Sequence, residues 1–149
     1  MKNYLFLPVL LFIVFACGSN KTEPEVLPVA ETTMWNIDMD STGNLVKKQV
    51  LTPEIDSLSP ENVIAYLNNN NPAIKLVYNK VSGDTLFIKI PDATHLTQQM
   101  GSAGPEVYMA EAVYNCTEIP GIKYVTFDFE EGDHAQPGTY KREDFNTVK

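Results

Sequence analysis

The stretch GSAGPEVYMAEAVYNCTEIPGIKYVTFDFE, residues 101–130, contains the longest unbroken series of structural signals in the chain. Pro105 suits the first turn of a helix, and Glu106 is stabilised there because the helix dipole is positive at its N-terminus. Apolar side chains then recur at helical spacing until Pro120 and Gly121 end the pattern. The stretch therefore predicts a helix between a Ser/Gly/Pro loop and a tight turn.

The end of the same stretch predicts a β-strand. Val125, Phe127 and Phe129 alternate with polar residues, as in a strand that buries one face. Such a face needs a helix or a second sheet to cover it.

The chain from residue 34 onward contains further strand and helix signals. Gly43 and Asn44 predict a hairpin turn, and Gly83 predicts another. Ser59 suits a helix N-cap, and Pro60 suits the first helical position. The predicted elements are strands at 35–39, 45–51, 74–81 and 85–90, a helix around 63–67, and an optional short edge strand near Tyr140.

This β-β-α-β-β-α-β order predicts an α+β fold, with two helices packed on one face of a roughly five-stranded sheet. Residues 34–145 form the predicted domain, which is large enough to bury a core without disulfide bonds. Residues 146–149 are a short tail.

The N-terminus, MKNYLFLPVLLFIVFAC, has a lysine followed by an apolar run that is too short to span a bilayer. Residues 1–16 are therefore predicted to be a signal peptide. Val14 to Cys17 resembles the lipobox of bacterial lipoproteins, which implies cleavage before Cys17 and acylation of this residue with chains such as palmitate. The alternative is an ordinary signal peptide with an incidental cysteine. The resemblance places the protein at a cell membrane, as a lipid-anchored chain that does not cross it.

Residues 17–33 are rich in proline and glutamate and have no periodicity, so they predict a flexible tether. Gly18 in place of aspartate indicates the outer membrane if the cell is Gram-negative, and the domain would face either the periplasm or the exterior. Without residues 1–16 the chain has ten basic and nineteen acidic side chains. This acidic surface disfavours nucleic acid and anionic headgroups.

Cys116 has no partner for a disulfide bond if Cys17 carries lipid. Its position inside the predicted helix favours a small buried apolar residue over a reactive thiol.

Several segments together resemble the GerMN (sporulation and spore germination) domain, which is found in bacterial lipoproteins. These segments are the turn and strand at 43–46, the helix at 63–67, the strand at 85–90, Gly101-Ser102, the helix end at 112–117, and Ile119 to Ile122. The resemblance implies a scaffolding or binding role without chemistry, and it supplies no catalytic residue or cofactor.

His95 and His134 are the candidates for a metal or catalytic site, since Asp92 and Asp133 lie near them in sequence. The chain lacks HxH, HExxH and CxxC spacing, so solvated loop histidines are the favoured interpretation. Ser102 lacks the motif of an activated nucleophile.

Two further groups have a functional and a structural interpretation. Gly101 to Gly104 could hold an anion before the helix, but the P-loop residues are missing, which favours a helix cap. Asp128, Glu130, Glu131 and Asp133 could serve calcium binding or glycoside hydrolysis, although a solvated strand edge is favoured.

Three motifs resemble the Asp-Ser/Thr signal for O-glycosylation in some bacterial periplasms. They are Asp40-Ser41-Thr42, Asp56-Ser57-Leu58 and Asp84-Thr85-Leu86. The alternative is that Asp-Ser and Asp-Thr are common in turns.

Two functions follow as expectations. The first is a lipid-anchored, non-catalytic scaffolding or binding module that meets another envelope protein or a glycan. The second is a small-ligand-binding or weakly hydrolytic protein that uses the loops at 91–101 and 130–134. A pocket shared by these loops, with His95 near His134 or Asp133, would favour the second. A flat outer sheet face bearing Tyr124 would favour the first.

Overall fold

A computed structural model describes residues 34–52 and 58–146. The predicted signal peptide, Cys17, the tether, Ser57 and the last three residues of the tail lie outside the described residues. In the described part, no helix combines the length and the apolar character needed to cross a bilayer.

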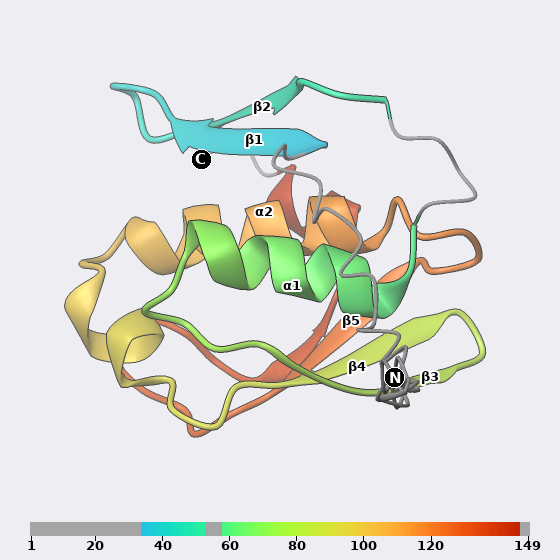
Figure 1. The fold of residues 1–149 in the computed structure, drawn as a ribbon. Helices are drawn as coiled ribbons and strands as arrows, with labels where there is room; N and C mark the ends of the chain where they lie inside the picture. Colours follow the sequence, from blue (N-terminus) through green and yellow to red (C-terminus); the bar gives the residue numbers. More distant parts are fainter. Residues whose placement is uncertain (1–33, 53–57, 147–149) are drawn as a thin grey trace, which may run out of the picture.

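The described chain contains six strands and four helical segments, and Figure 1 labels α1, α2 and the strands β1 to β5. They are β1 (Trp35–Met39), β2 (Leu45–Gln49), α1 (Pro60–Asn70), β3 (Val77–Ser82), β4 (Thr85–Lys89), the π-helix η2 (His95–Gln99), α2 (Gly104–Cys116), β5 (Tyr124–Asp128), β6 (Gly138–Tyr140) and the 3₁₀-helix η3 (Arg142–Phe145).

These elements form three layers (Figure 1). The β1–β2 hairpin is one outer layer, α1 and α2 form the middle layer, and a four-stranded sheet is the other outer layer. The sheet has the order β3-β4-β5-β6, in which β4 and β5 run parallel while the two outer pairs are antiparallel. The parallel pair follows from the chain path, because α2 crosses the sheet between β4 and β5.

The predicted α+β class is confirmed, but the single five-stranded sheet is wrong. Within the described residues, β1 and β2 pair only with each other, and they cover the side of α2 that faces away from the larger sheet. The fourth strand of the larger sheet is β6, at the position where an edge strand near Tyr140 was an option. The alternation in β1 indicates a buried face, and it does not tell which element covers that face.

The core lies on the inner face of the four-stranded sheet. Leu86 and Ile88 of β4 stand beside Val125 and Phe127 of β5 in register, and all four are buried. The predicted apolar faces of these strands are therefore confirmed. Because α2 lies between the sheet and the hairpin, it is buried on almost every side, including at Asn115.

Some boundaries differ from those predicted. β3 begins at Val77 instead of residue 74. At Leu76 the backbone N–H and carbonyl bond to the Asn68 side chain and not to another strand. The Asn68 Oδ1 accepts from the Leu76 N–H at 2.7 Å, and its Nδ2 donates to the Leu76 carbonyl at 2.9 Å. Within the predicted polar loop after β4, His95–Gln99 form the π-helix η2.

Candidate functional site

Among the described residues, β3 is the most exposed strand of the four-stranded sheet. All six of its residues are exposed, and they include Val77 at 40%, Tyr78 at 37% and Val81 at 40%. β3 pairs with β4 on one side and forms the end of the sheet on the other. An unpaired strand edge with apolar side chains is a template for pairing with another chain.

The β3 edge contains an irregularity at Asn79. The pairing with β4 shifts between Tyr78 and Lys80, so that Asn79 has no counterpart in the register. Such a bulge bends and twists its strand. Bulges of this kind limit uncontrolled edge-to-edge pairing of strands.

The outer face of the same sheet carries rings, hydroxyls and lysines. The Lys80 ammonium lies 5.0 Å from the centre of the Phe87 ring. The Thr126 and Thr139 hydroxyls are 2.8 Å apart on β5 and β6. Tyr124, which was predicted to mark this face, is half-buried next to Thr85 in the register.

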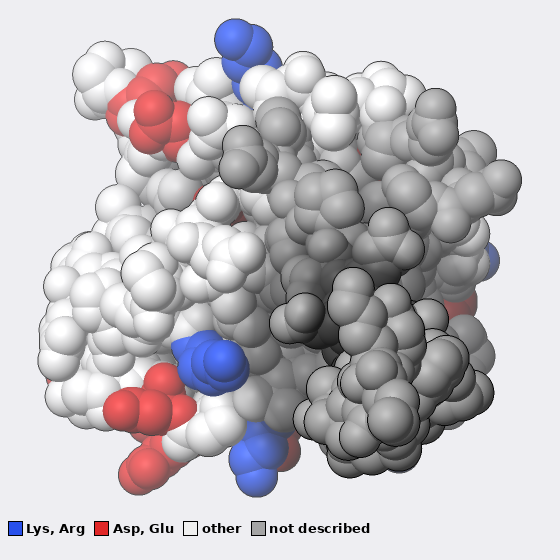
Figure 2. Space-filling model, in the orientation of Figure 1, with Lys and Arg blue, Asp and Glu red and all other residues white. Residues whose placement is uncertain are grey.

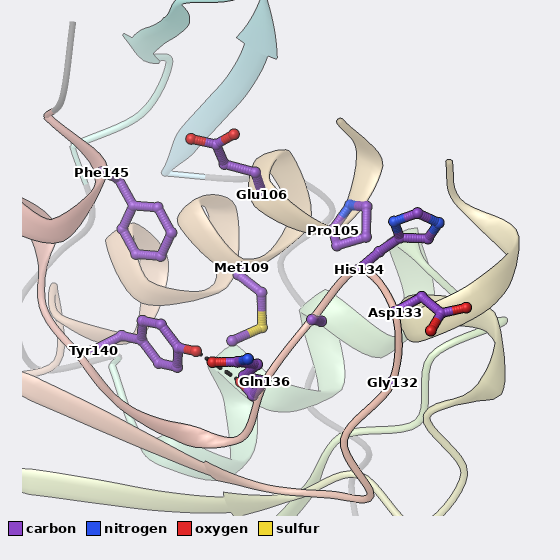
Figure 3. A pocket seen from close by; sticks show the side chains of 10 residues that line it. Pro105, Glu106, Met109, Gly132, Asp133, His134, Gln136, Tyr140 and Phe145 are labelled. Atoms are coloured by element: carbon purple, nitrogen blue, oxygen red, sulfur yellow. Dashed lines mark hydrogen bonds between the residues drawn. The ribbon is translucent and has the colours of Figure 1, made fainter. Parts of the chain in front are cut away.

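A hollow of about 350 Å³ lies where the start of α2 meets the loop after β5 (Figure 3). Its wall combines apolar, aromatic, polar and charged side chains. The lining residues are Pro105, Glu106, Met109, Gly132, Asp133, His134, Ala135, Gln136, Tyr140 and Phe145. In Figure 3 the Tyr140 and Phe145 rings lie beside Met109, whereas His134 and Asp133 lie at the opposite end.

The two loops of the alternative prediction touch each other without sharing this hollow. The His134 N–H donates to the Thr97 carbonyl at 3.2 Å, and a Cβ on Gly132 would stand 2.5 Å from the Thr97 Cβ. The hollow is lined by residues 132–136, and no residue of 91–101 is among its lining residues.

The two histidines are not brought together in the hollow. His95 Nδ1 lies 3.1 Å from the Gln99 Oε1 within η2, while His134 lines the hollow. Across residues 34–52 and 58–146, no group of three His, Cys, Asp or Glu side chains could hold a metal ion. Asp92 instead accepts the Thr94 N–H at 3.0 Å, which lowers the pKa of its carboxyl.

The loop before α2 forms a turn that leads directly into the helix. Gly101 adopts a φ of +68°, and α2 begins at Gly104 with Pro105 in its first turn, as predicted. Among the described residues, no side chain caps the N-terminus of α2. Ser102 is exposed on this turn. The chain from Ala93 to Pro105 has no Lys, Arg, Asp or Glu, and the middle of the left side in Figure 2 is white, with acidic groups above and below it.

The acidic residues at the end of β5 are solvated. Asp128, Glu130, Glu131 and Asp133 are all exposed, whereas Phe129 is buried between the first two. The predicted alternation is therefore confirmed. Cys116 is fully buried, and burial raises the pKa of its thiol to about 12, so it remains protonated at neutral pH.

Sequence reasoning missed the two polar contacts that hold the layers together. Asn115 is fully buried in α2, and its Oδ1 accepts from the Met34 and Trp35 N–H groups at 3.1 and 3.2 Å. Its Nδ2 donates to the Trp35 carbonyl at 3.0 Å and to the Glu111 carbonyl at 2.8 Å. An asparagine inside an otherwise apolar stretch was the available signal, since buried amides need partners.

The second missed contact is a cluster around Arg142. Its guanidinium lies 5.3 Å from the Trp35 ring centre and 5.0 Å from that of Tyr114. It donates to Glu118 at 2.6 Å and to Thr117 at 2.7 Å. Burial would raise the pKa of the Glu118 carboxyl, but hydrogen bonds from Trp35 and Arg142 and the charge of Arg142 lower it. The cluster joins the hairpin, the end of α2 and η3.

None of the comparisons identified a similar protein: no family model, no curated protein and no solved structure matches this chain significantly.

Proposed function

We propose that this chain is a lipid-anchored protein of the cell envelope whose GerMN-like domain is a non-catalytic binding module. Acylation of Cys17 holds the chain at a membrane, most simply the outer membrane of a Gram-negative cell, and the tether of residues 17–33 gives the domain reach. The domain binds another envelope protein.

One observation carries this proposal: within the described residues, β3 is an edge strand that pairs only with β4. Its exposed Val77, Tyr78 and Val81 offer apolar contacts, while the backbone of an edge strand offers unpaired hydrogen-bonding groups. An extended segment of a partner adds to such an edge through main-chain hydrogen bonds, and alternate side chains give specificity. The other end of the sheet, β6, has only three residues and offers less backbone.

The experiment is photo-cross-linking in the native envelope. A photoreactive phenylalanine analogue replaces Tyr78 at the β3 edge, and in a second sample it replaces Tyr124 on the outer sheet face. We expect one stoichiometric partner to be cross-linked at position 78. A partner captured only from position 124 would move the binding surface from the strand edge to the sheet face, and capture at neither position would refute the binding module.

A charge at the β3 edge provides a matched test. Val77→Lys places an ammonium group on an exposed side chain, so we expect the domain to fold normally and the yield of captured partner to fall at least tenfold. Val46→Lys is the control, because Val46 on β2 is exposed at 49% and lies in the other sheet. Equal losses in both variants would contradict a role specific to β3.

The hollow near Met109 supports a second candidate, the binding of a small ligand. Its volume of about 350 Å³ and its mixed wall of rings, a thioether and polar groups suit a small organic molecule. Ala135 lines this hollow, so Ala135→Trp would place a large ring in it. We expect it to abolish shifts of the Met109 methyl resonance in fragment screening by NMR and to leave partner capture at β3 unchanged.

A further inference from the structure

The turn between β1 and β2 carries one of the three Asp-Ser/Thr motifs. Residues 40–44 connect the strands, and Figure 1 shows this turn projecting from the end of the hairpin layer. Asp40, Ser41 and Thr42 are exposed. A modifying enzyme can reach them without opening the domain.

The turn holds Asp40 in a defined position. Its Oδ1 accepts the Thr42 N–H at 2.8 Å, the Thr42 hydroxyl at 2.6 Å and the Asn44 N–H at 3.0 Å. Gly43 has a φ of +83°, and its N–H donates to the Asp40 carbonyl at 3.0 Å, which closes the turn. The three bonds all end on Oδ1, and Oδ2 is the oxygen that we expect a recognising enzyme to contact.

The two hydroxyls of the motif differ in their engagement. The Thr42 hydroxyl donates to Asp40 and accepts from the Asn44 amide at 2.8 Å, so a substituent on it would disrupt the turn. Within the described part of the chain, no hydrogen bond engages the Ser41 hydroxyl. Ser41 is therefore the hydroxyl of the motif that could receive a sugar without disrupting the turn.

The motif at Asp84 is less accessible. Thr85 opens β4, an inner strand, and is half-buried between Ser82 of β3 and Tyr124 of β5 in the register. A transferase would have to open the sheet to bind the backbone on both sides of Thr85. The third motif, at Ser57, lies outside the described residues.

We propose that Ser41 is an O-glycosylation site, recognised through Asp40 in the preformed turn. The donor is a sugar activated as a diphosphate. The Ser41 Oγ attacks the anomeric carbon and forms the C1–Oγ bond, while the C1–O bond to the diphosphate breaks and the diphosphate leaves with the electron pair. The hydroxyl proton passes to a base of the transferase. The proposal rests on the export of the chain in the proposed function.

Trypsin separates the three motifs into different peptides. Cleavage after lysine gives residues 22–47 with Ser41, residues 49–75 with Ser57, and residues 81–89 with Thr85. Mass spectrometry of the full chain from its native envelope, with fragmentation that preserves the sugar, then locates any modification. We expect the mass of one or more sugar residues on Ser41. A sugar confined to any other hydroxyl of residues 22–47, or to residues 81–89, would overturn the assignment.

Two variants and a control test the recognition. Ser41→Ala should abolish the added mass on residues 22–47. Asp40→Asn keeps an Oδ1 acceptor for the turn but removes the charge, and we expect at least a tenfold lower occupancy of Ser41. Ser82→Ala is the control and should leave the occupancy of Ser41 unchanged. Ser82 is also exposed in a hairpin, but it does not follow an aspartate. Retention of the sugar in Ser41→Ala would refute the site, and full occupancy in Asp40→Asn would refute recognition through Asp40.

The same spectra separate this proposal from the proposed function. A chain that is acylated at Cys17 but carries no sugar on Ser41 overturns the glycosylation site and leaves the anchored binding module intact. A chain with an uncleaved, unmodified N-terminus overturns the envelope address, and glycosylation after export fails with it.

Discussion

At the residue scale, Asn115 is the polar side chain on which the contact between the hairpin and α2 depends. All four of its hydrogen bonds are made inside the protein, two of them to the backbone N–H groups of Met34 and Trp35. A buried donor that loses its acceptor pays its full desolvation cost.

We therefore expect Asn115→Ala to lower the free energy of unfolding by roughly 2–4 kcal/mol. Urea denaturation measures this loss, and hydrogen exchange should show faster exchange at the Met34 and Trp35 amides than elsewhere. Asn69→Ala, on the exposed side of α1, is the control and should have little effect. Uniform exchange across the domain would argue against a local role for Asn115.

A second prediction at this scale concerns Tyr108, which is 2% exposed. Within the described residues its hydroxyl has no hydrogen-bond partner, so the free-energy cost of removing this hydroxyl from water is not compensated by a hydrogen bond. Tyr108→Phe removes that hydroxyl and should raise the free energy of unfolding by about 1 kcal/mol. A higher urea midpoint with an unchanged m-value would show this.

Tyr66→Phe is the matched control, since the Tyr66 hydroxyl accepts a hydrogen bond from the Asn70 side chain. It should lower the midpoint. A lower midpoint in Tyr108→Phe as well would mean that the Tyr108 hydroxyl has a partner in solution.

At the element scale, the Arg142 cluster predicts a pH dependence of stability. The pKa of Glu118 is lower in the folded protein than its ordinary value of 4.5. The unfolded chain therefore binds the proton more tightly, so the contribution of Glu118 is present above pH 4.5 and is lost as the pH falls through its folded pKa.

We expect Glu118→Gln to weaken this loss of stability below pH 4.5. The fluorescence of Trp35, the only tryptophan of the chain, follows the transition because its ring N–H donates to Glu118 at 2.7 Å. Glu143→Gln, an exposed neighbour on η3, controls for the general effect of removing one acidic charge. Identical acid transitions in the two variants would contradict the prediction.

Some elements could be predicted from the sequence, whereas the position of others in the fold could not. α2 and β5 were predictable because their signals are local: Pro105 lies in the first turn of the helix, Pro120 and Gly121 follow its end, and Val125 starts an alternation. The location of the hairpin was not predictable, since the alternation in β1 is the same whether α2 or another strand covers it. The hollow near Met109 was missed for the same reason, because its wall combines α2, the loop after β5 and η3.

At the scale of the whole molecule, the three layers make the hairpin part of the fold. β1 covers the side of α2 that the larger sheet leaves open, and Ile37 is buried there. Removal of residues 34–52 would expose an apolar helix face without a second cover.

We expect a chain that begins at residue 58 to lose cooperative unfolding and to bind the dye ANS, while it retains much of its helical circular dichroism. The comparison is the intact domain from residue 34, which should bind no dye and unfold in one step. A sharp transition in the shortened chain would show that the four-stranded sheet and its helices fold without the hairpin.

The link between Met34 and Asn115 has a mechanical consequence. If the chain is anchored at Cys17 and bound to a partner on β3, as proposed, tension between the two reaches the described part of the chain at Met34. That residue is bonded to the central helix as well as to its own hairpin, where the Val50 N–H donates to the Met34 carbonyl at 2.9 Å. The pull is thus shared between helix and hairpin, and the first strand need not peel away under load.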